Sequence, residues 1–539
     1  MSFSRSLLTR ARTLRCTHRR SLGTVPADTR HNLFEYTSGR WIMNNDLRIA
    51  ERKRVFNADG LRQLAAQFVN RSADEVLDLE KNDETDRNQS FLITMRDGFQ
   101  MVARIPYDYT PAKYHSVASE AATMAFLRAS GLPVPRVYGY SPVTDNAAGT
   151  EYIFMEHVSG TPLNLLWLNL DAADIVSIMR QAVQLEAQMM AIPFPAVGCL
   201  YYTKDLDKLG APGIALEDAN FSVGPDSRPH MWSGKRAELE VDRGPYKTAE
   251  AFLLGGAAKE LAYLKQFGQP RFPLDRVSRF VYGRRKQQPS DHIANLMRYN
   301  LIARHVAPTD PTQSRFAMRH HNLHACNIIV SRSLTDSTLK IVSLIDFQHN
   351  PILPFFLLSV FPGDFANSHD PISQAMTPPP LPETHDGMDE NARLMEKEYY
   401  RRRLVHYHYL KQLEEHHPER YASLTALLAD FRQAMARGGS GQWDGDSMLL
   451  RRGLMGIAEE LWPYLCGDED TPCPIAFDEK QTMLRQDTYA RIGCRHDTWS
   501  HVETFDEVLG RLNYVRDMFP PGPAQQVLDE LWGDLDEDE

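Results

Sequence analysis

One stretch, residues 319–348, constrains the fold and function of this 539-residue chain more than any other. It begins with a polar loop, RHHNLHACN, which runs directly into the apolar residues IIV. A polar turn follows, and a second apolar run, LKIVSLI, leads to Asp346. Two neighbouring strands of this kind place Asn327, at the start of the first, beside Asp346, at the end of the second. The pattern therefore predicts a loop–strand–turn–strand unit with polar side chains at one edge.

These two residues have the chemistry of a magnesium site. Magnesium is a hard cation that takes carboxylate and amide oxygens as ligands, and Asp346 and Asn327 supply one of each. The whole stretch resembles the motif H-x-D-L-H-x-x-N followed by I-D-F/W, which forms the nucleotide and metal site of kinase-like phosphotransferases. The matching positions here are His320, Leu323, His324, Asn327 and Asp346.

The position of the catalytic aspartate in that motif holds Asn322. In phosphoryl transfer this aspartate accepts or orients the proton of the attacking hydroxyl. An amide forms hydrogen bonds there, but it is not a useful base near neutral pH. His321 or His324 are the alternative bases, because histidine titrates near neutrality, and the histidine cluster is also an alternative zinc site. We favour neither alternative and interpret His320 and His324 as scaffolding of the loop.

Composition and charge bound the class of protein. The hydrophobic content of 42% and the charged content of 24% are globular values, and the length predicts two or three subdomains. A net charge of -10 argues against general nucleic-acid binding, and nothing in the sequence identifies a protein partner. Six cysteines in so long a chain are no disulfide framework, so Cys466 and Cys473 are interpreted as free thiols. The most apolar stretch, residues 351–360, is too short to span a membrane and is predicted to be core.

The first 27 residues differ from the rest of the chain. They carry six arginines, several serines and threonines, and no acidic residue before Asp28. Such a segment is typical of a mitochondrial transit peptide, and a basic disordered tail is the alternative. We therefore expect a mitochondrial protein. The acidic run at residues 534–539 is expected to be a solvated tail.

Residues 28–157 are predicted to form a small β-rich lobe. Two strand-like runs, 90–95 and 99–105, flank Arg-Asp-Gly, which predicts a hairpin. A helix is predicted over 115–129, ended by the sequence GLPVP. This order is that of a kinase small lobe. The remaining predicted elements are a helix over 51–69 and strands over 136–140 and 151–156.

Two positions of this lobe bear on nucleotide binding. Arg104, on the second hairpin strand, stands where many kinases carry a phosphate-binding lysine, and Glu120 in the following helix is its expected partner. Arginine is a permanent cation whose fork fits a carboxylate or phosphates, and an ordinary surface salt bridge is the alternative. The loop at residues 84–91 has no glycine to let backbone amides approach phosphates, and its acids Glu84 and Asp86 would repel a triphosphate. We do not expect this loop to cradle phosphates.

The end of the second apolar strand is the candidate link between two lobes. The residues are Met155, Glu156, His157 and Val158, just before Ser-Gly-Thr-Pro. Their backbone groups are expected to hydrogen-bond an adenine ring. A simple strand-to-turn transition explains the same sequence, and the residues alone do not separate the two interpretations.

Residues 158–539 are predicted to form a larger, mostly helical lobe. Residues 200–248 show no clear period and are long for a loop, so we interpret them as a functional insertion, with a peripheral excursion as the alternative. The sequence TPPPLP at 377–382 is typical of a peripheral segment. Helices are predicted over 174–191, 249–267, 291–307, 395–435 (two helices broken near Pro418), 447–465 and 499–518.

In this order, the motifs resemble the aminoglycoside phosphotransferase and choline kinase family, most closely its fungal mitochondrial branch. The resemblance implies a two-lobed α+β fold of protein-kinase type, ATP with Mg²⁺, a hydroxyl acceptor, and a link to mitochondrial maintenance. It also implies that Asn327 and Asp346 are metal ligands, that Glu120 bridges the lobes, and that Arg104 is the branch's own arginine. The segments that carry it are FEYTSGRW (34–41), VARIP (102–106), SEAATM (119–124), LPVP (132–135), YIFME (152–156), GPD (224–226), AEL (237–239), DRGP (242–245), the central loop and IDFQ (345–348).

Two departures from the family pattern shape the functional hypothesis: Asn322 at the base position and the glycine-free loop at 84–91. The first hypothesis is a degenerate kinase-like protein of mitochondria that works by binding nucleotide and metal or by regulation. The alternative is an active ATP-dependent O-phosphotransferase that acts on a small hydroxyl metabolite. A different, nucleotidyl-type chemistry on the same fold is a third possibility.

Overall fold

The computed structural model describes residues 33–41, 45–274, 276–333, 335, 337–382, 388–468 and 470–477. The predicted transit peptide, the helix predicted over 499–518 and the acidic tail lie outside these residues. The chain divides into two compact units, which are described separately below. Unit 1 contains residues up to 34, 55–228 and 310–430, and unit 2 contains residues 35–54, 229–309 and those from 431 on.

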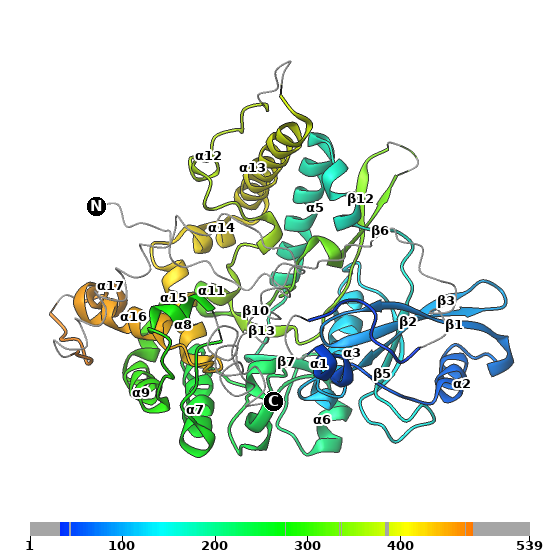
Figure 1. The fold of residues 1–539 in the computed structure, drawn as a ribbon, viewed down its shortest axis with the longest axis horizontal. Coiled ribbons are helices and arrows are strands. Elements are labelled where there is room, and N and C mark those ends of the chain that lie inside the picture. The colour runs from blue at the N-terminus through cyan, green and yellow to red at the C-terminus, as the bar shows by residue number, and fades with distance from the viewer. Residues whose placement is uncertain are drawn as a thin grey trace, which may run out of the picture. The chain divides into compact units, whose positions relative to one another are not determined.

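An antiparallel five-stranded sheet in the order β1-β2-β3-β5-β4 dominates the N-terminal part of unit 1 (Figure 1). Phe91 of β2 pairs with Ala103 of β3, which pairs in turn with Phe154 of β5, and all three side chains are buried. The hairpin and the two later strands are therefore confirmed. The strands are β1 (Val76–Glu84), β2 (Asn88–Met95), β3 (Gln100–Pro106), β4 (Val137–Ser141) and β5 (Tyr152–Glu156).

The predicted helix after the hairpin is confirmed as α3 (Lys113–Ala129). Its buried residues Val117, Ala121 and Met124 belong to the same apolar cluster as Ile153 and Met155 of β5. This packing against the sheet holds the face of α3 that carries Glu120 toward β3. The helix is thus placed by apolar contacts, and its one buried carboxylate is available for an ion pair.

The helix predicted over 51–69 is confirmed as α2 (Ala58–Phe68), in unit 1, but its predicted start is wrong because residues 52–57 are not helical. Glu51 is the last residue of a separate helix, α1 (Asn45–Glu51), in unit 2. Asn57 caps α2 by accepting a 3.1 Å hydrogen bond from the backbone nitrogen of Gly60. A helix cannot run through an N-cap, because the cap residue has extended backbone angles.

Two further sheets complete unit 1. The order of the first is β10-β13-β7-β9-β8, and that of the second is β12-β11-β6. Helices α5 and α13 pack against each other, and α5 also packs on β12 (Figure 1). The strands are β6 (Thr161–Pro162), β7 (Gly198–Tyr202), β8 (Ile214–Ala215), β9 (Phe221–Gly224), β10 (Phe316–Met318), β11 (Ile328–Arg332), β12 (Leu339–Leu344) and β13 (Pro351–Pro354).

The helices of unit 1 largely follow the periodic segments of the sequence. The predicted break near Pro418 is confirmed, but the segment 395–435 is covered by three helices rather than two, since α15 begins at Ala429. The apolar stretch 351–360 is buried as predicted, in β13 and α11. The helices are α4 (Leu163–Leu166), α5 (Ala172–Met190), α6 (Thr203–Leu209), α10 (Pro311–Ser314), α11 (Phe355–Leu358), α12 (Pro371–Gln374), α13 (Glu390–His416) and α14 (Pro418–Thr425), with short 3₁₀ turns η2 (Ala73–Glu75), η3 (Trp167–Asn169), η6 (Ala325–Asn327) and η7 (Gly363–Phe365).

Residues 200–248 contain regular structure despite their lack of a sequence period. They run through most of β7, α6, β8 and β9, and then through two 3₁₀ turns. Short strands separated by turns leave no helical or long alternating pattern, so the periodicity argument could not detect them. The two turns, in unit 2, are η4 (Pro229–Met231) and η5 (Gly234–Glu238).

Unit 2 is built from helices around a buried ion-pair cluster. Glu260 accepts hydrogen bonds from Arg236 at 2.6 and 2.9 Å and from Lys259 at 2.8 Å. The backbone nitrogen of Trp443 donates to the same carboxylate at 2.7 Å. The predicted helix over 447–465 is confirmed, with a π-helical turn inside it. The helices are α1, α7 (Ala249–Phe267), α8 (Arg276–Val281), α9 (Pro289–Val306), α15 (Ala429–Ser440, mostly in this unit), α16 (Met448–Gly456), the π-helical turn η8 (Ile457–Leu461) and α17 (Trp462–Cys466).

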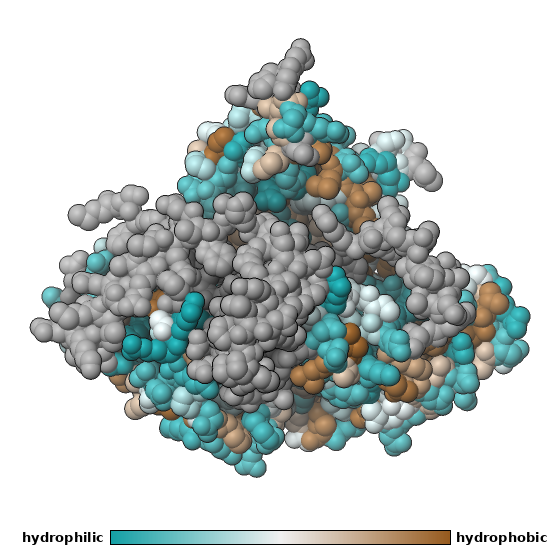
Figure 2. Space-filling model, viewed as in Figure 1, coloured by the Kyte–Doolittle hydropathy of each residue, from teal (hydrophilic) through white to brown (hydrophobic). Residues whose placement is uncertain are grey.

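The predicted α+β class, a β-sheet region at the N-terminus followed by a largely helical region, is confirmed. Within the described part of the chain, every helix is too short or too polar to cross a bilayer. On the face shown in Figure 2, hydrophilic residues predominate over the visible described surface, and hydrophobic residues form small separate groups. Scattered exposed apolar residues of this kind are ordinary for a protein surface.

Candidate functional site

The central stretch folds as its sequence predicts, into a loop followed by the antiparallel pair β11 and β12. Ile328 pairs with Leu344, and one step further the backbone nitrogen of Ile345 donates a 3.0 Å hydrogen bond to the carbonyl oxygen of Asn327. Asn327 and Asp346 therefore lie at the same end of the pair. Asp346 has a φ of 70°, in the left-handed region that non-glycine residues rarely enter, and such backbone strain is concentrated at functional sites.

Asn322 connects the two strand ends through both parts of its structure. Its side-chain nitrogen Nδ2 donates a 3.0 Å hydrogen bond to Oδ2 of Asp346. Its backbone carbonyl accepts a 2.9 Å hydrogen bond from Nδ2 of Asn327. The structure thus brings the three predicted residues into one connected network.

Arg104 reaches the same carboxylate from the sheet. Its guanidinium donates one nitrogen to Glu120 of α3 and another to Oδ1 of Asp346. The predicted partnership of Arg104 with Glu120 is confirmed, and the surface salt bridge alternative is wrong, because the Glu120 side chain is only 3% exposed. The contact with Asp346 was not predicted. One permanent cation therefore pairs with the buried carboxylate of Glu120 and the partly buried carboxylate of Asp346.

With one cation between two carboxylates, the pKa values of Glu120 and Asp346 shift in opposite directions. Burial raises the pKa of Glu120 to about 7, and the charge of Asp346 adds to the rise, although Arg104 opposes it. Burial also disfavours the charged form of Asp346, but there the attraction and hydrogen bond of Arg104 are stronger and hold its pKa well below the usual range. Asp346 is therefore ionised across the physiological pH range.

The histidines of the loop have structural partners. His320 is fully buried, shares a 2.9 Å hydrogen bond with the carbonyl oxygen of Ile345, and has a pKa lowered to about 4 by burial. Nδ1 of His324 lies 3.1 Å from Oδ1 of Asp364. Nδ1 of His321 lies 3.1 Å from Oδ1 of Asn350. Each ring has a different acceptor, and the described residues contain no group of three or more His, Cys, Asp or Glu residues suited to a metal ion.

Sequence reasoning missed the residues that fasten this loop to its surroundings. Oδ2 of Asp364 accepts a 2.8 Å hydrogen bond from the backbone nitrogen of Ala325. Gln348 is buried, accepts a 2.8 Å hydrogen bond from Asn88 at the start of β2, and donates to Ser116 of α3 at 3.4 Å. The motif signals Asp346, but nothing in it indicates contacts with residues 260 and 232 positions away.

Two of the four residues of the predicted lobe link, Met155 and Glu156, belong to strand β5. Met155 pairs with Val102 and is buried. Oε2 of Glu156 accepts hydrogen bonds at 3.0 Å from Arg128 and from the backbone nitrogen of Arg136, so this side chain joins β5 to the segment after α3. His157 and Val158 are half-buried and follow the end of β5. A binding role for the backbone of these four residues stays a prediction.

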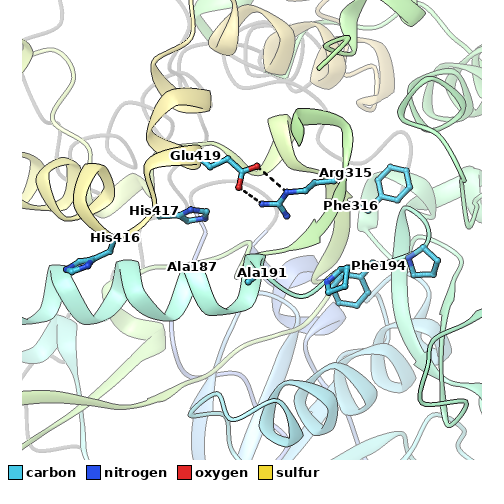
Figure 3. Close-up of a pocket in the computed structure, with 10 residues that line it drawn as sticks. Ala187, Ala191, Phe194, Arg315, Phe316, His416, His417 and Glu419 are labelled. Atoms are coloured by element: carbon cyan, nitrogen blue, oxygen red, sulfur yellow. Dashed lines mark hydrogen bonds and ion pairs between the residues drawn. The ribbon is translucent and has the colours of Figure 1, made fainter. Parts of the chain in front are cut away.

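A surface pocket of about 600 Å³ lies in another part of unit 1 (Figure 3). Arg315 and Glu419 form an ion pair on one wall, at 2.9 Å, and His417 lies between them and the helix that carries Ala187. The pocket contains none of the residues predicted for nucleotide or metal binding. It is lined by Ala187, Ala191, Pro193, Phe194, Pro195, Arg315, Phe316, His416, His417 and Glu419.

Comparison with known families agrees with this geometry. The model of the phosphotransferase enzyme family matches residues 78–349, which begin in β1 and end just after Asp346. The chain belongs to this phosphotransferase enzyme family. The match covers half of the chain and includes every candidate nucleotide or metal residue named above, and the predicted resemblance to aminoglycoside phosphotransferases is confirmed.

The chain is similar to two proteins known by sequence and to one solved structure, as follows. It is 30% identical to a subtelomeric hrmA-associated cluster protein of Aspergillus fumigatus, over 75% of this chain and 82% of the relative. It is 25% identical to altered inheritance of mitochondria protein 9, mitochondrial, of Yarrowia lipolytica, over 63% of this chain and 62% of the relative. The crystal structure of ADP-bound aminoglycoside phosphotransferase APH(2'')-Ib matches at 13% identity with a TM-score of 0.35, over 81% of this chain and 96% of the other.

Proposed function

We propose that this protein is a degenerate member of the phosphotransferase family that binds adenine nucleotide with Mg²⁺ and transfers phosphate poorly or not at all. One observation carries the proposal. The side chain at the base position is the amide of Asn322, and its nitrogen donates a hydrogen bond to Asp346, whereas a base would accept a proton. An amide has no proton-accepting capacity near neutral pH, so this position lacks the group that activates a hydroxyl.

We infer that the histidines of the loop act as scaffolding rather than as a replacement base. His320 is buried and hydrogen-bonded, while His321 and His324 face Asn350 and Asp364. General base catalysis contributes about 10²–10⁴-fold to a rate. A site that keeps its scaffold but loses this factor is suited to binding or to regulation.

The residues present fit a magnesium ion. Asp346 is ionised and Asn327 has its Nδ2 committed to the backbone of Asn322, which leaves Oδ1 as its ligand atom. One carboxylate oxygen and one amide oxygen at the same strand ends are the hard ligands that this ion takes. When bound, the ion would neutralise phosphate charge, while Arg104 holds Asp346 and Glu120 in place.

We further propose that the protein acts in mitochondria, in a role linked to their maintenance. The support is the arginine-rich, acid-free start of the chain, together with yeast relatives that are named as mitochondrial. A fusion of residues 1–27 to a fluorescent protein tests the location. Mitochondrial fluorescence that disappears when the six arginines are changed to glutamine is the expected result, and diffuse fluorescence of the unchanged fusion contradicts it.

Calorimetric titration of the purified protein with ATP and Mg²⁺, paired with an assay of ADP formation, tests the biochemical proposal. We expect saturable binding with ADP formation no faster than that of an Asp346→Ala control. Rapid ADP formation that Asp346→Ala abolishes would instead establish the active phosphotransferase alternative. Absence of any nucleotide binding would refute the binding role that we propose.

A further inference from the structure

The turn between β1 and β2 takes the place of the glycine-rich loop that this chain lacks. We propose that the guanidinium of Arg87, in this turn, binds the phosphates of the nucleotide. The inference rests on the proposed nucleotide-binding function and names the residue that recognises the charged part of the ligand. From the sequence we did not expect this segment to cradle phosphates, because it has no glycine and carries two acids.

One of those acids is already neutralised within the turn's own strand. Glu84 is buried, and its carboxylate forms a 2.7 Å ion pair with Lys81. Its charge is therefore compensated locally and does not oppose an anionic ligand. Asp86 is exposed. The repulsion expected from two acids is thus reduced to that of one side chain in solvent, where charges are strongly screened.

The backbone of Arg87 is held from both sides. Its nitrogen donates to Oγ1 of Thr85 at 3.3 Å. Its carbonyl oxygen accepts from the backbone nitrogen of Tyr107 at 3.0 Å and from Oγ1 of Thr110 at 2.6 Å. These contacts bind the turn to the segment that follows β3. A cation on so well-fixed a backbone loses little freedom when a ligand binds.

The turn also lies against the metal-ligand segment. Asn88, the next residue, donates a buried 2.8 Å hydrogen bond to Gln348, two positions after Asp346. His349 is buried and its Nδ1 lies 2.7 Å from the carbonyl oxygen of Ser227. Burial lowers the pKa of His349 to about 3, and the charge of Arg87 contributes to that decrease.

Among the residues that the structure describes, Arg87 differs from the other cations around the site because its guanidinium has no hydrogen-bond or ion-pair partner. Arg104 is shared between two carboxylates, Lys81 is paired with Glu84, and Arg228 is paired with Asp226 at 2.5 Å. The side chain of Arg87 is half-buried, yet it makes no hydrogen bond or ion pair with the described residues. A half-buried guanidinium without an anion is suited to a ligand that brings one, and its fork matches phosphate oxygens.

The chemical consequence is a different means of holding phosphates. A glycine-rich loop binds them through backbone amides, which require close approach of the chain. A single arginine binds from a greater distance through charge-assisted hydrogen bonds, and it tolerates side chains in the turn. The ligand class is therefore a nucleoside diphosphate or triphosphate, whose phosphates Arg87 recognises.

Calorimetric titrations with ATP, ADP and adenosine, each in the presence of Mg²⁺, test the assignment. The variants are Arg87→Gln, Arg87→Lys and, as a matched control in the same turn, Asp86→Asn. We expect Arg87→Gln to weaken ATP and ADP binding about tenfold and to leave adenosine binding unchanged, because only the phosphates meet the guanidinium. Arg87→Lys should retain part of the affinity, and Asp86→Asn should not weaken it. Thermal unfolding of each variant checks that the fold is intact.

Three outcomes would overturn the assignment. If Arg87→Gln binds ATP as the unchanged protein does, Arg87 does not contact the phosphates, although nucleotide binding itself stands. If ATP and adenosine binding fall by the same factor, the substitution acts through the shape of the site. If the unchanged protein binds none of the three compounds, the proposed function fails, and the assignment fails with it.

Discussion

Asn322 donates a 3.0 Å hydrogen bond from its side-chain amide to Asp346, 24 residues later in the chain. With Arg104 on the other oxygen, both oxygens of this carboxylate receive donors from protein side chains. At the position where the family motif carries an aspartate, this contact orients the neighbouring carboxylate. Under the proposed function, Asn322 therefore supports metal and nucleotide binding and does not act as a base.

Changing Glu120 to glutamine should alter how stability depends on pH. The pKa of Glu120 is raised from 4.5 to about 7 by burial, so between these values the unfolded chain has released the proton that the folded chain retains. The unfolded state then binds fewer protons, and the free energy of unfolding falls as pH rises through this window, by about 3 kcal/mol in total. Denaturant unfolding of both proteins from pH 5 to pH 8 measures the difference.

The expected result is that Glu120→Gln gains stability relative to the unchanged protein as the pH rises toward 7. Parallel stability curves for Glu120→Gln and the unchanged protein would show that burial does not hold the proton on Glu120.

Removing Glu186 should destabilise the fold severely. This buried carboxylate of α5 accepts hydrogen bonds from Arg319 at 2.5 Å, from Arg420 at 2.7 Å and from Tyr409 at 2.8 Å. Glu186→Ala leaves two buried guanidinium groups without their anion, which costs about 3–5 kcal/mol. Urea unfolding measures the loss. The same assay on Glu419→Gln, which breaks the more exposed pair with Arg315, should show less than about 1 kcal/mol.

Equal effects of the two substitutions would contradict this account of the cluster. Arg319 immediately precedes His320, so its ion pair with Glu186 also anchors the first residue of the loop at residues 319–327. We expect Glu186→Ala, at temperatures where it remains folded, to weaken nucleotide binding as well.

Asn327→Ala should remove the contribution of Mg²⁺ to nucleotide binding. The thermal shift caused by ATP should be larger with Mg²⁺ than with a chelator in the unchanged protein, and equal under both conditions in the variant, because one of two hard ligands is gone. Cys326→Ser, in the same short turn, is the control and should keep the difference. A variant that keeps the full Mg²⁺ effect would exclude Asn327 as a ligand.

The parts of the site that the sequence predicted are those that depend on local order. The Asp-Gly dipeptide between two apolar runs indicated the β2–β3 hairpin, and Gly131 with the following prolines indicated the end of α3. The pair of Arg104 and Glu120 was predicted from the correspondence with kinases, once these two elements were in place. Asn327 and Asp346 were brought together because they lie at adjacent ends of the two predicted strands, β11 and β12.

The parts of the site and fold that the sequence did not predict depend on contacts between distant segments, or on strands whose sequence lacks a clear apolar alternation. The contact of Arg104 with Asp346 joins residues 242 positions apart and depends on how the sheet meets the loop. Strand β1 was missed because its sequence, VLDLEKNDE, is largely charged and only Leu79 and Glu84 are buried. The start of α2 did have a signal in the sequence. Asn57 is a common N-cap residue, and Asp59 follows it in the first turn, where acidic residues are enriched.

The rate of ATP hydrolysis by the Asn322→Asp variant tests the central claim most directly. We expect ADP formation to rise by at least about 100-fold over the unchanged protein, because the variant restores a carboxylate where the amide stands and base catalysis contributes on that scale. The double variant Asn322→Asp, Asp346→Ala should lose this gain. Equal rates of ADP formation by the unchanged protein and by Asn322→Asp, in proteins that bind ATP equally well, would contradict the account.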